Sequence, residues 1–367
     1  MVQRMQEKVI QDVPGLDFAI GTHSYNKIPD VIAAVLRGDG PVLECSEEDD
    51  REATLDEHID GSISAFVNIL FGCDRHCAYC IVPEVRGKEW SRNGVSICNE
   101  VSKLAESGVK EVTLLGQSVM SYGRKDAVWA KDFVSTMGFQ EPLPRLLEAV
   151  SSIEGIKRVR FTSGHPSGCS LELARAMGEL PEVCGHLHLP VQSGADRILK
   201  MMGRGYDRAG YIEAVGRIRE KVPDLAITTD VIVGFPSETE DEFEATRSLM
   251  EEISFDNAFI FKYSPRPDTR ALKWEDDVSD EEKLRRNKVL LDDQDKRGTL
   301  INEGLIGKTV EVMAEGPSKR NTDRWAGRSS ANKIVIFEHA SGVEVGDLVD
   351  VLIERAMPQT LYGKIEN

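Results

Sequence analysis

The chain lacks the features that place a protein in a membrane or bind it to nucleic acid through bulk charge. No run of about 18 apolar residues occurs, and the start, MVQRMQEKVIQDVPG, is polar and amphipathic. We therefore expect a cytoplasmic protein. The net charge of −17 over 367 residues leaves no surplus of cations. This argues against indiscriminate nucleic-acid binding but does not exclude a local basic patch.

The seven cysteines are too scattered for a disulfide framework in a chain of this length. Three of them stand together in FGCDRHCAYC, residues 71–80, as Cys73, Cys77 and Cys80. Three thiolates on one loop can wrap around an iron-sulfur cube, in which each iron binds one cysteine sulfur. One iron is then left open for a cofactor.

Two other uses of these thiols remain open from spacing alone. Cys77 and Cys80 could form half of a zinc site with His76 or a distant histidine, but no second well-spaced pair is present. A thioredoxin-type redox pair is disfavoured by the third cysteine that precedes it. The isolated Cys98, Cys169 and Cys184 are expected to be small packing residues.

Six short apolar runs alternate with helical patterns between residues 61 and 300, which predicts parallel βαβ units. Each run is followed by a polar loop, and in a parallel barrel such loops meet on one rim. Residues 1–43 form a helix–strand–helix pattern, and residues 44–60 form an acidic linker with nine carboxylates against Arg51 alone. Short β-branched runs in residues 304–367 predict a small antiparallel β-barrel. The six apolar runs are SAFVNIL, EVTLLG, RVRFTS, HLHLPV, LAITTDVIVG and NAFIFKYS.

Some residues have both a structural and a functional interpretation. His186 and His188 alternate along one predicted strand, and packing is favoured over metal binding for them. Trp325 lies between Arg324 and Arg328 in the tail. Cations beside an indole suit phosphate contact and base stacking on single-stranded RNA, so we favour RNA binding over a solvated loop.

The pattern CxxxCxxC, with Tyr79 before its last cysteine, resembles the signature of radical S-adenosylmethionine (SAM) enzymes. This resemblance implies an α/β fold with a partial (β/α)6 barrel over residues 61–300. It also implies a [4Fe-4S] cluster bound by Cys73, Cys77 and Cys80, with SAM on the open iron. The blocks LLGQSVMSYG, HLHLPVQSGADRILKMMGRGY and ITTDVIVGFPSETEDEF narrow the resemblance to the methylthiotransferases. Residues 304–367 are similar to their RNA-binding TRAM domain.

Within that family the chain is most similar to enzymes that act on tRNA. These replace the C–H bond at C2 of N6-dimethylallyladenosine, next to the anticodon, by a methylthio group. The resemblance implies one SAM as methyl donor, a second as radical source, an electron donor such as flavodoxin or ferredoxin, and a sulfur source. The alternatives are a threonylcarbamoyl-adenosine in tRNA, a ribosomal-protein aspartate, or an RNA-binding remnant whose cluster is structural.

By the same resemblance, Tyr79 is expected to pack near the adenine of SAM. Contacts to SAM or the substrate base are expected from loop residues, and no catalytic residue is assigned. The family also has an N-terminal α/β domain with three further cysteines for an auxiliary cluster, and this sequence contains no such set. We therefore expect residues 1–43 to be a remnant of that domain in a truncated member, which binds one cluster and cleaves SAM without completing methylthiolation alone. The expected contact residues are Gln117, Ser163, Gln192 and Asp230.

Overall fold

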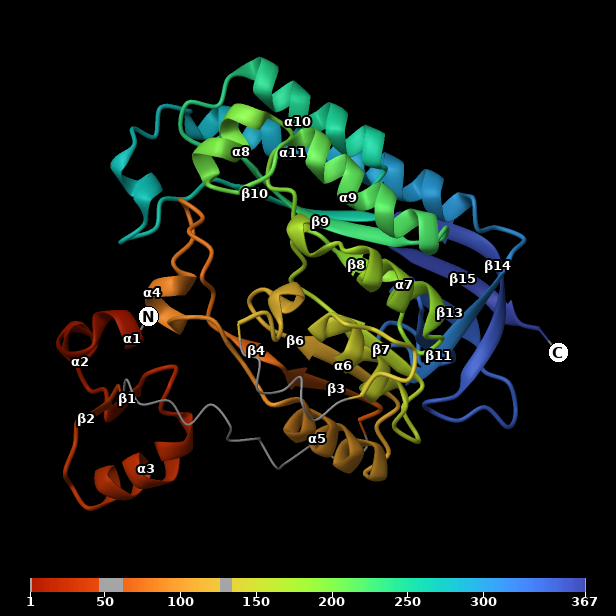
Figure 1. The fold of residues 1–367 in the computed structure, drawn as a ribbon, viewed down its shortest axis with the longest axis horizontal. Helices are drawn as coiled ribbons and strands as arrows, with labels where there is room; N and C mark the ends of the chain where they lie inside the picture. The colour runs from red at the N-terminus through yellow and green to blue at the C-terminus, as the bar shows by residue number, and fades with distance from the viewer. Residues whose placement is uncertain (1, 46–61, 126–133, 367) are drawn as a thin grey trace.

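A computed structural model describes residues 2–45, 62–125 and 134–366 of the chain (Figure 1). Most of the expected acidic linker, residues 44–60, lies outside the described residues. The described residues form an N-terminal segment, a central set of parallel strands covered by helices, and a C-terminal barrel. Within these ranges no helix combines the length and apolar character that a membrane crossing requires.

Six parallel strands form the centre of the molecule, in the places that the alternating pattern predicts. They make two three-stranded sheets, in the orders β3–β6–β7 and β8–β9–β10. The sheets are joined where Val159 bridges Val183 and where the Gly164 N–H donates to the His188 carbonyl at 3.0 Å. Strands β3 and β10 are left as the two edges of a partial barrel, which confirms the predicted fold class. The strands are β3 (Ser64–Asn68), β6 (Glu111–Leu115), β7 (Arg158–Phe161), β8 (His186–His188), β9 (Ala226–Val233) and β10 (Asn257–Lys262).

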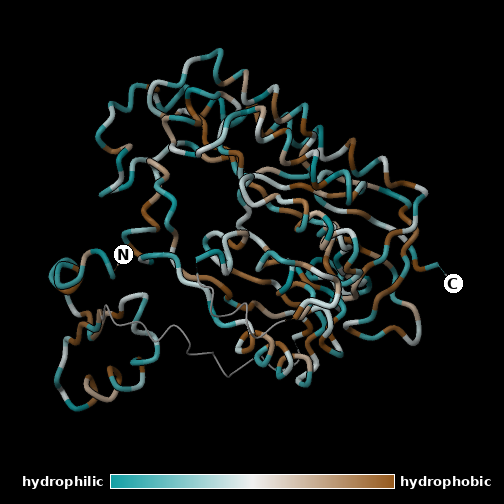
Figure 2. Tube along the Cα trace, in the orientation of Figure 1, coloured by the Kyte–Doolittle hydropathy of each residue, from teal (hydrophilic) through white to brown (hydrophobic). Residues whose placement is uncertain are grey.

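Amphipathic helices cover the outside of these strands and bury a continuous apolar core, in which Leu114, Phe161 and Ile227 are almost fully buried. Figure 2 shows hydrophobic and hydrophilic positions mixed along the helices at the top of the view. Helix α10 begins with a capping box in which Thr239 and Glu242 satisfy each other's backbone N–H groups. The covering helices are α5 (Gly94–Glu106), α6 (Pro142–Ser151), α7 (Leu171–Glu179), α9 (Arg208–Lys221), α10 (Glu240–Ile253) and α11 (Asp280–Glu303).

The N-terminal segment packs beside the central domain near its cysteine loop. Its two strands pair in parallel, and β2 is an element that the sequence pattern did not predict. The Thr22 hydroxyl donates to the Val85 carbonyl at 2.8 Å, and Arg4 pairs with Asp268 at 3.2 Å. These contacts join the segment to the rim of the barrel. Its elements are α1 (Val2–Met5), α2 (Glu7–Asp12), β1 (Phe18–Ile20), the 3-10 helix η1 (Tyr25–Lys27), α3 (Ile28–Leu36) and β2 (Val42–Glu44).

The C-terminal residues form a closed five-stranded barrel, as predicted, but β13 and β15 pair in parallel while the other pairs are antiparallel. Trp325 packs against the barrel core, and the His339 ring stacks on it at 4.2 Å. The indole is therefore not the open stacking platform that we expected. Arg324 and Arg328 lie on the opposite face of the strand, because side chains alternate. The strands are β11 (Thr309–Pro317), β12 (Arg324–Ser329), β13 (Ile334–Glu338), β14 (Leu348–Met357) and β15 (Thr360–Ile365).

The loop that joins β12 to β13, taken with the last residue of β12 as residues 329–333, closes the amino-terminal end of the central barrel. Arg160 donates to the carbonyls of Ser329 and Ser330 at 2.8 and 2.9 Å, and Arg158 donates to the Arg328 carbonyl. The Lys333 Nζ lies 2.6 Å from the Asp256 carboxylate. We call this loop the hairpin loop; it fixes the C-terminal barrel to the strands.

Candidate metal and cofactor site

The loop that carries the three cysteines is held by hydrogen bonds from distant parts of the chain. The Ala78 N–H donates to the Met202 carbonyl at 2.8 Å, and the Ala271 N–H donates to the Ala78 carbonyl at 2.8 Å. Gly72, before the first cysteine, has a φ of +69°, and a Cβ there would lie 2.1 Å from the Lys88 carbonyl oxygen. Only glycine fits this turn. The nearby short elements are β4 (Leu70–Phe71), α4 (Val82–Arg86), β5 (Trp90–Ser91), α8 (Asp196–Met202) and the 3-10 helices η2 (Val119–Ser121), η4 (Pro166–Gly168) and η5 (Arg270–Lys273).

A cavity of about 380 Å³ lies beside this loop, and we call it the cluster cavity. It brings together side chains that follow β6, β7 and β8, because the carboxyl ends of parallel strands share one rim. We expected Asp230 on a loop, but it lies within β9. The ligand contacts of these residues stay predictions. The lining includes every site residue predicted from the sequence: Cys73, Cys77, Tyr79, Cys80, Gln117, Ser163, Gln192 and Asp230.

Two of these residues adopt strained backbone conformations. Ser163 has a φ of 57° and Gln192 a φ of 73°, in the left-handed region that side chains disfavour. Each such residue costs about 1–2 kcal/mol. Strain of this kind at a cavity wall is typical of functional loops.

Two arginines line the cluster cavity beside the cysteines. Arg204 is only 8% exposed; its Nη1 lies 3.4 Å from the Cys77 Sγ, and its Nη2 donates to the Pro190 carbonyl at 3.1 Å. Arg75 contacts the hydroxyls of Ser118 and Ser167. Among the described residues, neither guanidinium has a carboxylate within ion-pair distance. A buried cation without a counter-charge is costly, so these positions favour an anionic group in the cavity.

Two further polar atoms in the cavity wall lack good partners. The buried Oε1 of Gln117 has no hydrogen bond. His165 is 4% exposed, and its Nδ1 accepts from the Ser167 N–H at 3.2 Å, which leaves the proton of the neutral ring on Nε2. That Nε2 has no partner of good geometry and only a weaker interaction with the Arg204 backbone. Burial, with Arg204 and Arg75, lowers the pKa of His165 to about 2, so the ring stays neutral.

The cysteine loop fits the donor set that an iron-sulfur cluster requires. Burial raises the pKa of the Cys73 and Cys80 thiols, so iron binding would have to displace their protons. In the described ranges, no three His, Cys, Asp or Glu side chains are placed to hold one metal ion. A cube differs from a single ion because each thiolate binds a different iron. The unmatched Gln117 acceptor and His165 donor would suit the amino and carboxylate groups of SAM.

Cys169 and Cys184 are buried and Cys98 is half-buried, as packing residues would be, and the paired histidines have hydrogen-bond partners. Burial raises the pKa of Cys98 to about 11 and that of Cys169 to about 12, which disfavours the reactive thiolate form of both. His186 Nε2 and His188 Nδ1 both lie within hydrogen-bond distance of the Thr228 hydroxyl, at 3.2 and 2.9 Å. His188 also faces the Asp230 carboxylate at 3.5 Å.

Arg75, His165 and Arg204 are cavity residues that sequence reasoning missed, and His188, for which packing was favoured, also lines the cavity. Arg75 lies inside the cysteine motif, and His165 lies two residues after Ser163, so the local sequence carries a signal for both. Arg204 follows α8 and reaches the cavity through the tertiary fold, for which the sequence carries no local signal.

Comparison with known proteins gives two family matches. The model of the radical SAM superfamily matches residues 67–250, and that of the TRAM domain matches residues 304–365. The chain is 41% identical to a tRNA-2-methylthio-N(6)-dimethylallyladenosine synthase from Akkermansia muciniphila, over 99% of this chain and 81% of that protein. It is also 41% identical to the protein of the same name from Syntrophus aciditrophicus, over 100% of this chain and 77% of that one.

Proposed function

The chain belongs to the radical SAM superfamily and, within it, to the tRNA-2-methylthio-N(6)-dimethylallyladenosine synthase family, and we propose that it acts in the reaction its relatives are named for. The reaction is methylthiolation at C2 of N6-dimethylallyladenosine next to the anticodon of tRNA. The observation that carries the proposal is the cluster cavity. There three thiols, two cations that have no carboxylate partner in the described part of the chain, and two unmatched polar atoms face one space.

We assign roles to the chain's own residues as follows. Cys73, Cys77 and Cys80 hold the cluster, and Arg204 offsets its negative charge through the hydrogen bond to Cys77. Tyr79 packs edge-on against Phe235 with ring centroids 6.3 Å apart and provides an apolar wall for the SAM adenine. When bound, the reduced cluster and SAM supply the radical that removes hydrogen from the adenine.

Gln117 and His165 orient the amino-acid end of SAM by accepting from its amino group and donating to its carboxylate. Ser163, Gln192 and Asp230 are left to face the ribose and the substrate base. His165 donates this hydrogen bond over the whole physiological pH range, because its pKa of about 2 keeps the ring neutral and Nδ1 is already an acceptor.

We further propose that this chain binds one cluster. Four of the seven cysteines lie apart from the cysteine loop, on different elements: Cys45 after β2, Cys98 in α5, Cys169 after η4 and Cys184 before β8. Anaerobic reconstitution should give about four irons per chain. A value of about eight irons would show a second cluster and contradict this assignment.

The C-terminal barrel is proposed to bind the anticodon loop, since TRAM is the family of its match. An electron donor of the flavodoxin or ferredoxin type and a separate sulfur source complete the reaction. We place the enzyme in the cytoplasm, where these partners and tRNA occur.

The test is mass spectrometry of tRNA nucleosides from a strain that lacks this protein. Loss of the 2-methylthio group from isopentenyladenosine, with other nucleosides unchanged, is the expected result. Loss from threonylcarbamoyl-adenosine would identify a different substrate. If the tRNA is unchanged and the reconstituted protein yields no 5′-deoxyadenosine under reduction, the protein is an RNA-binding remnant with a structural cluster.

A further inference from the structure

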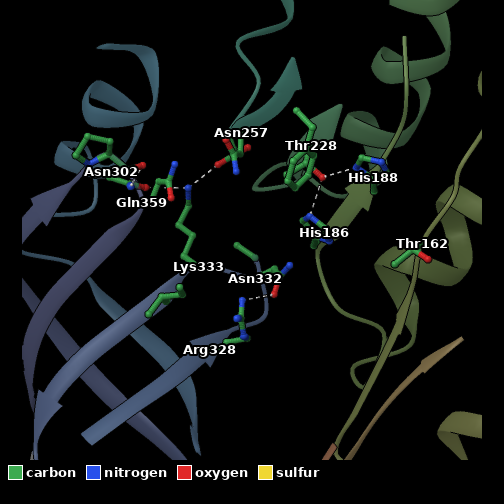
Figure 3. Close-up of a pocket in the computed structure, with 15 residues that line it drawn as sticks. Thr162, His186, His188, Thr228, Asn257, Asn302, Arg328, Asn332, Lys333 and Gln359 are labelled. Carbon is green, nitrogen blue, oxygen red and sulfur yellow. Dashed lines mark hydrogen bonds and ion pairs between the residues drawn. The ribbon is translucent and has the colours of Figure 1, made fainter. Parts of the chain in front are cut away.

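A second cavity, of about 410 Å³, lies between strands β8–β10 and the hairpin loop (Figure 3). We call it the seam cavity. Its wall on the hairpin side is held by hydrogen bonds: Arg160 donates to the Ser329 and Ser330 carbonyls, and the Gly185 N–H donates to the Ser330 hydroxyl at 2.8 Å. The space is therefore preformed and does not depend on a ligand to organise it.

The seam cavity and the cluster cavity share one residue of their walls. His188 lines both, with Nδ1 turned to Thr228 on the seam side and Nε2 facing Asp230 on the cluster side. The two cavities are therefore neighbours, with the His188 side chain between them.

The charged groups of the seam cavity are matched within the protein. Lys333 lies 2.6 Å from Asp256 and donates to the Asn302 side-chain oxygen at 2.9 Å, and Arg328 lies 3.3 Å from Glu315. Burial, and to a smaller extent the nearby cations, lowers the pKa of His186 to about 3, so its ring is neutral. A free carboxylate would have to compete with Asp256 or Glu315 for its cation. This cavity accordingly favours an uncharged ligand.

Apolar surface is also available in this cavity. Phe259 of β10 is 49% exposed, and its ring packs against His188 with centroids 6.0 Å apart. Ala331 and Ile334 line the hairpin side. An exposed aromatic ring and aliphatic side chains that line one cavity offer burial to a short branched hydrocarbon chain.

The shape of the substrate relates the two cavities. In adenine, C2 and C6 both flank N1, and the bonds that leave the ring at these two carbons diverge. When C2 is presented in the cluster cavity, the N6 substituent leaves the ring in a different direction and needs a space of its own. We propose that the seam cavity receives the N6 substituent of the target adenine and selects a short, branched, uncharged alkenyl group. This inference rests on the proposed function and adds the part of the protein that recognises the modified base.

The test is a binding experiment and needs no turnover. Three RNA stem-loops that differ only at N6 of the target adenosine, unmodified, dimethylallyl or threonylcarbamoyl, are titrated by fluorescence anisotropy. The cluster-reconstituted protein is held with SAM and without reductant. We expect the dimethylallyl RNA to bind more tightly than the unmodified RNA by about tenfold or more, since each buried methylene contributes about 0.8 kcal/mol.

Two variants and one matched control localise the effect. Phe259→Ala removes the aromatic wall, and Ala331→Phe fills the space; both should reduce the preference to near unity while unmodified RNA still binds. Phe261→Ala is the control, because Phe261 is two positions along the same strand, is 52% exposed and does not line the seam cavity. It should keep the preference. Phe259 is half exposed, so its variant should fold even if Ala331→Phe does not.

The outcomes separate this inference from the proposed function. Equal binding of the three RNAs, tighter binding of the threonylcarbamoyl RNA, or an equal loss in the Phe259 and Phe261 variants would each overturn the seam-cavity assignment alone. Failure to bind any of the three RNAs would overturn the proposed function, and with it this inference.

Discussion

The cluster cavity and the seam cavity meet at His188 but differ in how their cations are matched. In the cluster cavity, Arg204 contacts a cysteine sulfur and, like Arg75, has no carboxylate partner among the described residues. In the seam cavity, Lys333 and Arg328 each have one. The cluster cavity therefore carries unbalanced positive charge unless it holds an anionic group, whereas the charges of the seam cavity are balanced by protein carboxylates.

This difference indicates two kinds of recognition within one barrel. A low-dielectric wall with unmatched cations stabilises a negatively charged cluster and raises its reduction potential. A wall with matched charges selects by shape and apolar contact. Four substitutions can break or sharpen this comparison.

The largest effect is expected from Cys77→Ala. Removal of one thiolate leaves two ligands, which cannot hold a cube against solvent, so iron should fall from about four per chain to near zero. Reductive formation of 5′-deoxyadenosine should be lost with it. Cys98→Ala is the matched control, since Cys98 lies on α5 away from the cavity, and it should keep its iron. Full iron in the Cys77 variant would refute the assignment.

Arg204→Met tests the unmatched cation of the cluster cavity. Loss of a charge-assisted hydrogen bond, about 1.5–3 kcal/mol, should lower the reduction potential and cut the reduced fraction at fixed solution potential on the order of tenfold. A redox titration followed by electron paramagnetic resonance measures this. Arg204→Lys should recover part of the shift, and an unchanged potential in the methionine variant would contradict the role.

Lys333→Met tests the matched pair of the seam cavity. Both side chains of the Lys333–Asp256 pair are only 14% exposed, so the variant should lose about 1–3 kcal/mol of unfolding free energy in urea. The surface pair of Lys364 with Glu354 serves as the comparison, and Lys364→Met should change stability little or not at all. Equal losses in the two variants would show that the hairpin loop is not held by this contact.

The smallest effect is expected from Thr228→Val. This variant removes the hydroxyl that His186 and His188 share, which should cost about 1 kcal/mol of unfolding free energy. Iron content should stay unchanged, because the hydroxyl is not in the cluster cavity. Thr228→Ser should restore stability. A loss of iron would show that the two cavities are coupled more tightly than the contacts indicate.

Much of the fold and of the cluster cavity could be predicted from local sequence. The six strands follow from short β-branched runs alternating with helical patterns, and the shared rim follows from their parallel direction. Residues as far apart in sequence as Gln117 and Gln192 were therefore expected in one place, and both line the cluster cavity. Their contacts with SAM stay predictions.

The rest depended on tertiary contacts that leave no local pattern. Arg204 enters the cavity wall after α8, and only the folded chain brings it to Cys77. The sequence of the hairpin loop is that of an ordinary polar turn, yet Arg160 and Asp256 hold this loop at the end of the barrel. Trp325 suggested an exposed platform because its neighbours are charged, but strand alternation turns the indole to the core.

The hairpin loop holds the C-terminal barrel against the central barrel. It joins the two barrels through Arg158, Arg160 and Lys333, and these contacts set the distance between the C-terminal barrel and the cysteine loop. If the C-terminal barrel binds the RNA as proposed, this distance determines which nucleotide reaches the cluster cavity. The nucleotide at the matching distance from the bound segment would then lie in the cluster cavity, and its neighbours would not. Position along the RNA would be selected by length before the base itself is recognised.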